Sequence, residues 1–94
     1  MKYQLRLRTE AEKDMSQAYN WYNDQQTGLG DVFLCSVETM LEKISEHPLR
    51  FPLIHKSVRR ALISQFPYAI FFTLKGSTIE VLAVFHCKRN PIFQ

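Results

Sequence analysis

Two short clusters of basic residues carry the side chains that could bind or cleave a phosphate-containing partner. One is the run His86-Cys87-Lys88-Arg89, and the other is the pair Arg59-Arg60. Arginine and lysine bind phosphate oxygens through charge-assisted hydrogen bonds and stabilise the charge of a phosphoryl transition state. His86 has the side chain best suited to general acid or base catalysis. If the clusters meet in the fold, the sequence predicts a site for a polyanion or an acidic protein. The alternatives are a solvated basic sheet edge and a structural role for His86.

The charges of the chain are segregated along the sequence. Residues 48–94 hold seven Lys and Arg and a single acid, Glu80, whereas residues 1–47 hold eight acids and five bases. The net charge of +3 conceals this division. A small domain with one basic region attracts polyanions and acidic protein surfaces.

Length and composition predict a single domain over residues 1–94. With 46% hydrophobic residues, a chain of 94 residues can form one core. No run reaches the ~20 apolar residues of a membrane helix, and the N-terminal run MKYQLRLRTE lacks the apolar stretch of a signal peptide. We therefore expect a cytoplasmic protein without membrane contact. Cys35 and Cys87 are distant in sequence and, with three scattered histidines, lack metal-ligand spacing, so we expect no disulfide, metal or cofactor.

The spacing of apolar residues predicts the order strand, helix, helix, strand, strand, strand. Alternation over residues 3–7 indicates a first strand, and helical spacing predicts helices over residues 9–25 and 29–47. Residues 49–57 are predicted as a loop, followed by strands at residues 58–63, 68–74 and 79–86. This order predicts an α+β fold in which a helical hairpin packs on one face of a mostly antiparallel sheet.

The last two predicted strands carry apolar residues on both faces. Strict alternation places Ile79, Val81, Ala83 and Phe85 under the helices, and Leu82 and Val84 on the opposite face with Phe71. A two-layer fold has no second layer to cover Phe71, Leu82 and Val84, and contiguous exposed apolar residues mark partner sites. The sequence therefore predicts a protein partner at these three residues. The alternatives are ordinary surface residues, or shielding by the C-terminal segment.

Several short motifs occur in a fixed order along the chain. They are Ala11-x-x-Asp14 with Trp21-Tyr22, residues 44–48 (ISEHP), the strand with Arg60, residues 66–72 (FPYAIFF) and residues 84–91 (VFHCKRNP). Over essentially the whole chain this pattern resembles the RelE/ParE superfamily of toxins from type II toxin–antitoxin modules, and most closely its ParE-like branch. The resemblance implies a β-α-α-β-β-β fold and a toxin held inactive by a cognate antitoxin, which would lie across Phe71, Leu82 and Val84 in a hetero-oligomer.

The resemblance to the ParE-like branch implies that the target is DNA gyrase and that the toxin acts by binding, in plasmid stabilisation or a stress response. In this chain the target-binding residues would then be Arg59, Arg60, Lys88 and Arg89.

The RelE-like branch implies a different activity, cleavage of messenger RNA on the ribosome. The catalytic residues would be His86, Arg60 and Arg89. This sequence departs from the RNA-cleaving pattern, since Ala69 follows Tyr68 where those members commonly carry arginine. A third alternative is a degenerate member that only binds its antitoxin. Of the three, we expect a ParE-like gyrase inhibitor.

Overall fold

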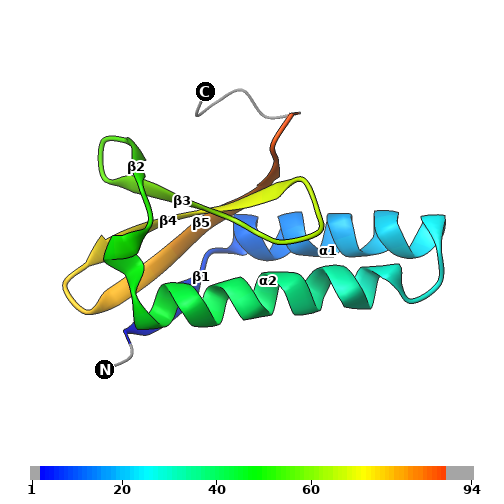
Figure 1. Ribbon diagram of the computed structural model, residues 1–94, viewed down its shortest axis with the longest axis horizontal. Coiled ribbons are helices and arrows are strands. Elements are labelled where there is room, and N and C mark those ends of the chain that lie inside the picture. Colours follow the sequence, from blue (N-terminus) through cyan, green and yellow to red (C-terminus); the bar gives the residue numbers. More distant parts are fainter. Residues whose placement is uncertain (1–2, 89–94) are drawn as a thin grey trace.

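The computed structural model describes residues 3–88, which form two layers. Along the chain the elements are β1 (Gln4–Leu7), α1 (Thr9–Gln25), α2 (Leu29–Glu46), the 3₁₀ helix η1 (Pro48–Arg50), β2 (Leu53–His55), β3 (Val58–Leu62), β4 (Tyr68–Lys75) and β5 (Thr78–His86). The two α-helices form a hairpin on one face of the sheet (Figure 1). The predicted fold class is therefore confirmed.

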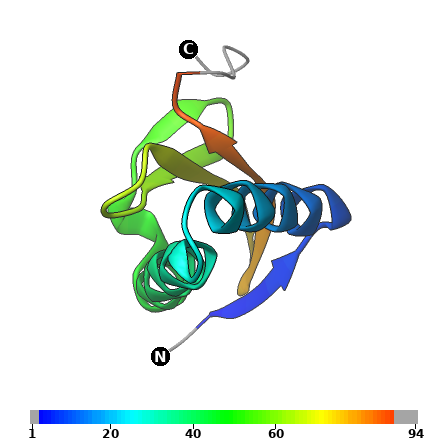
Figure 2. The same cartoon turned by 90° about the vertical axis from the view of Figure 1, so that its right-hand side faces the viewer.

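The sheet has the strand order β1-β5-β4-β3-β2. β1 lies at one edge and pairs parallel with β5, from Gln4 opposite Thr78 to Leu7 opposite Val81. The other neighbouring strands pair antiparallel. The first strand of the chain thus lies beside the last one (Figure 2).

The helical hairpin closes tightly because of two glycines. Gly28 adopts a left-handed conformation with a φ of 88° in the link between the helices. Gly30, two residues later, brings α2 against α1, and its N–H donates a 2.7 Å hydrogen bond to the Asn23 side chain. A Cβ atom at Gly30 would lie 2.6 Å from the Tyr19 carbonyl oxygen, so only glycine allows this approach.

The core fills the space between the hairpin and the sheet. Its fully buried large side chains are Phe33, Val37 and Ile44 from α2, Ile70 and Phe72 from β4, and Ile79, Val81 and Val84 from β5. α1 packs mainly on β5, while α2 contacts β3. The buried residues of α2 recur at helical spacing and form one apolar stripe, which faces the sheet.

A β-bulge in β5 changes which residues face the helices. Opposite β4, Phe71 pairs with Ala83 and Phe72 pairs with Val81, so Leu82 is the extra residue. Beyond the bulge the alternation is inverted, and Val84 joins the core with 2% exposure. The prediction that Val84 lies on the uncovered face is wrong for this reason. The matching prediction that Ala83 and Phe85 lie under the helices is also wrong, since both pack in a separate cluster with Phe71.

Residues 49–57 contain more structure than the loop that the sequence predicted. η1 follows directly on α2, and β2 forms the outermost strand, paired with β3. Lys56 makes the tight turn between them with a φ of 50°. Within residues 3–88, no helix is long and apolar enough to cross a membrane.

Candidate functional site

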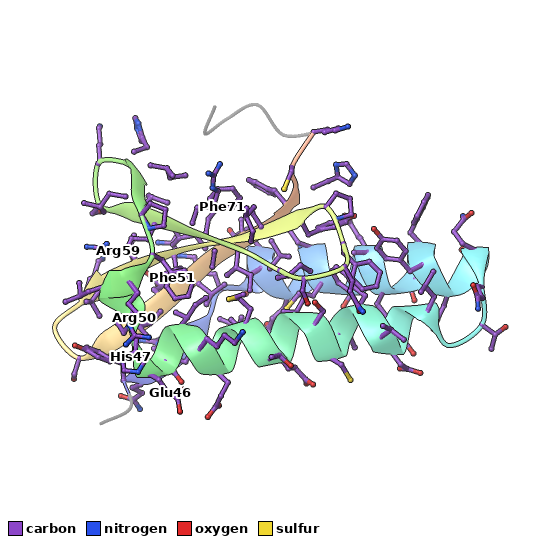
Figure 3. The ribbon with its side chains drawn as sticks, in the orientation of Figure 1. Glu46, His47, Arg50, Phe51, Arg59 and Phe71 are labelled. Atoms are coloured by element: carbon purple, nitrogen blue, oxygen red, sulfur yellow. The ribbon has the colours of Figure 1, made fainter. Side chains whose placement is uncertain are left out.

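The face of the sheet opposite the helices, called here the outer face, carries a small apolar cluster. Ala69, Phe71 and Ala83 form its centre, and Ile54, Val58 and Phe85 pack around them. The rings of Phe71 and Phe85 lie 5.6 Å apart. Phe71 is only 7% exposed, because side chains of the β2–β3 hairpin pack on it. Figure 3 shows Phe71 on the side of the sheet away from the helices.

The exposed apolar surface lies beside this cluster rather than on it. Leu62, which pairs with Ala69, is 56% exposed. On the other side of Ala69, its partner in β5 is Phe85, which is half-buried. Leu82, at the bulge, is also half-buried. The sheet therefore leaves apolar surface for a partner at Leu62, Leu82 and Phe85. The sequence analysis had placed it at Phe71, Leu82 and Val84.

Arg59 and Arg60 point to opposite faces of the sheet. Arg59 pairs with Phe72 and Arg60 pairs with Phe71, so Arg60 lies on the outer face and Arg59 on the helix side. Nη1 of Arg59 donates a 2.6 Å hydrogen bond to the carbonyl oxygen of Phe51. Figure 3 shows these two residues together beside η1. Arg59 thus holds the segment before β2 in place and does not share a face of the sheet with Arg60.

Lys88, just after the end of β5, lies apart from Arg60. Lys88 is exposed and follows β5, two strands from β3 and five residues beyond the row of Arg60. By strand geometry the Cα atom of His86, where β5 ends, already lies on the order of 14 Å from that of Arg60. Arg89 lies outside the described residues. The predicted convergence of these cations at one point is therefore not observed for Arg59, Arg60 and Lys88.

His86 lies on the helix side of β5, away from Arg60. Its ring contacts Tyr68 at 5.2 Å between centroids. Its Nδ1 accepts a 3.1 Å hydrogen bond from the N–H of Lys88. The catalytic set predicted for an RNA-cleaving enzyme would need His86 and Arg60 on one face, and the structure separates them.

Other cations on the outer face come from residues that the sequence analysis did not select. The register places Arg6 of β1 beside Glu80, which lies opposite Thr73, and Lys75 ends β4 on the same face. With Thr78 and Glu80 they line a hollow of about 290 Å³. Nε of Arg8 lies 3.3 Å from Oε2 of Glu80, and this contact lowers the pKa of the Glu80 carboxyl. The alternation of Arg6 with Leu5 and Leu7 is visible in the sequence, but the pairing of β1 with β5 is not.

The outer face is therefore basic and partly apolar. Arg6, Arg60 and Lys75 are exposed on it, and its acid, Glu80, is paired with Arg8. Such a surface suits an acidic protein segment that also carries apolar side chains. Within residues 3–88, no three His, Cys, Asp or Glu side chains gather closely enough to hold a metal ion.

These features define a class of small α+β proteins in which a helical hairpin covers one sheet face and leaves a basic face on the other side. Residues 5–91 match the family model described as "ParE toxin of type II toxin-antitoxin system, parDE", so the chain belongs to the ParE toxin family. Toxin ParE2 of Mycobacterium tuberculosis, in strains CDC 1551 and H37Rv, is 26% identical over 92 residues, which cover 97% of this chain and 88% of the relative.

Two solved structures share the fold. One, described as the chromosomal ParDE toxin–antitoxin system from P. aeruginosa, superposes with a TM-score of 0.83 at 15% identity, covering 93% of this chain and 98% of the other. The other is the RelBE2 toxin–antitoxin complex from Mycobacterium tuberculosis, with a TM-score of 0.64 at 21% identity, covering 92% and 99% of the two chains. At these identities the two structures support the fold alone.

Proposed function

We propose that this chain is neutralised by a cognate antitoxin that covers the outer face, and that the released toxin inhibits DNA gyrase. The observation that carries the proposal is the placement of Leu62 and Phe85 beside Arg60 on a sheet face without helices. The two similar solved structures are toxin–antitoxin assemblies, which supports an antitoxin partner. Membership in the ParE family supports gyrase as the target.

Within this proposal, the antitoxin contacts Leu62, Leu82 and Phe85, with Phe71 beneath them. Arg60 attracts the acidic residues of the antitoxin or of the target. Lys88, which is exposed just after β5, and Arg89, which lies outside the described residues, stay proposed target-binding residues. Arg59 is not among the proposed target-binding residues, because its guanidinium donates a hydrogen bond to the carbonyl oxygen of Phe51. Val84 is not among the proposed antitoxin-binding residues, because its side chain is buried in the core.

Antitoxin binding is tested with the protein encoded beside this gene. Leu62→Asp places a charge on the apolar surface and Arg60→Glu reverses the charge beside it, so each should weaken the complex at least tenfold in calorimetric titration. Lys13→Glu is the matched control, because Lys13 is exposed on α1, away from the outer face. Equal weakening by Lys13→Glu, or none by the outer-face variants, would place the antitoxin elsewhere.

The target is tested with the purified, antitoxin-free chain in two assays. Gyrase supercoiling and the formation of cleavage complexes should respond to the toxin, and messenger RNA in a translation reaction should remain intact. New RNA cuts that disappear in His86→Ala would establish the endoribonuclease instead. Activity in neither assay, with antitoxin binding retained, would identify a degenerate member.

A further inference from the structure

A cavity of about 380 Å³ lies between α1 and the C-terminal half of β5, at the open edge of the sheet. It exists because β1 is short. β1 stops pairing at Val81, so the rest of β5 has no neighbouring strand on that side. α1 crosses the open strand edge there and supplies Asp14, Gln17 and Trp21 to the lining. The sheet supplies Tyr68 and His86 from the helix side and Phe85 from the outer face.

Asp14 provides the negative charge of this cavity. Its Oδ2 accepts a 3.0 Å hydrogen bond from the N–H of Val84, the backbone group that a longer β1 would have paired. Burial raises the pKa of the Asp14 carboxyl, the Val84 bond opposes that rise, and the nearby charge of Glu10 adds to it. Among residues 3–88, no basic side chain forms an ion pair with Asp14. A cation entering the cavity would therefore relieve an electrostatic cost.

Aromatic rings form the walls around this carboxylate. Trp21 is 48% exposed, and its ring is fixed edge-to-face against Tyr22 at 5.0 Å. Tyr68 and His86 pack edge-to-face at the other side. The cavity thus combines one carboxylate with several aromatic surfaces, in a molecule whose outer face is basic.

We propose that this cavity binds the guanidinium group of an arginine side chain presented by a partner polypeptide. A guanidinium is planar, stacks on aromatic rings, and offers paired N–H donors that match a carboxylate. An ammonium group lacks the planar fork and is more strongly hydrated, which favours arginine over lysine. The inference goes beyond the proposed function, since it names a ligand that antitoxin binding on the outer face does not require, and it applies whichever target the toxin has.

Trp21 makes the test direct, because it is the one tryptophan of the chain and lies at the cavity. The purified protein is titrated with N-acetyl-arginine amide at constant ionic strength, and the fluorescence of Trp21 is followed. The neutral isostere N-acetyl-citrulline amide and N-acetyl-lysine amide are the reference probes. We expect a saturable change with the arginine derivative, a weaker one with lysine and none with citrulline.

Two variants separate cavity binding from a general effect of charge. Asp14→Asn keeps an acceptor for Val84 and removes the charge, so affinity should fall by at least about tenfold, as expected for lost charge-assisted hydrogen bonds. Gln17→Lys places a cation at the exposed side of the cavity and should abolish binding. The matched controls are Asp24→Asn and Gln25→Lys, which make the same changes at exposed positions near the end of α1.

Each outcome of the titration either supports or overturns the arginine site. Loss of the response in both cavity variants, with both controls unchanged, supports the arginine site. No saturable response in the wild-type protein overturns the proposal, as does a response that survives Asp14→Asn and Gln17→Lys. Equal responses to the arginine and citrulline derivatives would show that the charge of Asp14 does not contribute to binding. Equal responses to the arginine and lysine derivatives would overturn the choice of guanidinium.

Discussion

Replacement of Gly30 by alanine tests whether the hairpin depends on the contact between α1 and the start of α2. The added Cβ would lie 2.6 Å from the Tyr19 carbonyl oxygen and 2.8 Å from both Asn23 Oδ1 and Tyr19 Cδ1. The closest of these atoms belongs to the backbone of α1, which cannot move aside as a side chain would. The helices must separate at this point, and separation lengthens the hydrogen bond from Gly30 N–H to Asn23.

The expected cost follows from three terms. Overpacking of this kind costs about 1–3 kcal/mol. The lost hydrogen bond adds about 1 kcal/mol, and the better helix propensity of alanine returns at most about 1 kcal/mol. The free energy of unfolding should therefore fall by about 1–3 kcal/mol. For a domain of this size, a loss of about 2 kcal/mol lowers the melting temperature by roughly 10 °C.

The assay is urea unfolding followed by Trp21 fluorescence, with variants of Gly28 as the comparison. A Cβ at Gly28 meets nothing within 4 Å, but its φ of 88° is left-handed. Gly28→Ala should therefore be strained, whereas Gly28→Asn should be close to wild type, because asparagine tolerates that conformation. Gly30→Asn should gain no such rescue. A Gly30→Ala protein as stable as wild type would refute the reasoning.

Other substitutions test separate features of the fold. Because the pKa of Asp14 is raised in the folded protein, the folded protein retains a proton that the unfolded chain has already released. The free energy of unfolding should therefore fall as pH rises from the usual aspartate pKa to the raised pKa. Above the raised pKa it should stay level. Asp14→Asn should remove that slope in urea titrations at a series of pH values. Val84→Ala should cost about 2 kcal/mol, since two buried methyl groups are lost and a cavity remains. Leu62→Ala should change stability by less than about 0.5 kcal/mol in the same measurement. Arg8→Gln should leave the unfolding midpoint unchanged, because the ion pair with Glu80 is solvent-exposed.

The helices and the longer strands could be predicted because their apolar residues repeat at a clear period. α2 places Phe33, Val37, Leu41 and Ile44 on one stripe, and both ends of the helix coincide with residues that interrupt it, Gly28 and Pro48. Such signals are local, and packing against the sheet reinforced them. β2 was missed because three residues between prolines and a turn show too little alternation to be identified.

The faces of β5 could not be predicted, because residues 82–85 are all apolar and offer no alternation that marks the bulge. One extra residue at Leu82 inverted the orientation of Val84 and Phe85. The cavity at Asp14 was missed for another reason. It depends on where β1 stops along β5, and this is a contact between distant segments that leaves no local pattern.

The position of β1 also has a consequence for how the protein is made. Gln4 and its partner Thr78 are 74 positions apart in the chain (78 − 4). During synthesis the helical hairpin emerges early, but the strands that cover its apolar stripe follow later. β1 cannot form its strand pairing until β5 has been synthesised. Such sequence-distant pairing slows folding. A nascent chain interrupted before residue 78 has no β5 to join β1 to β4, so a truncated product cannot form the continuous sheet.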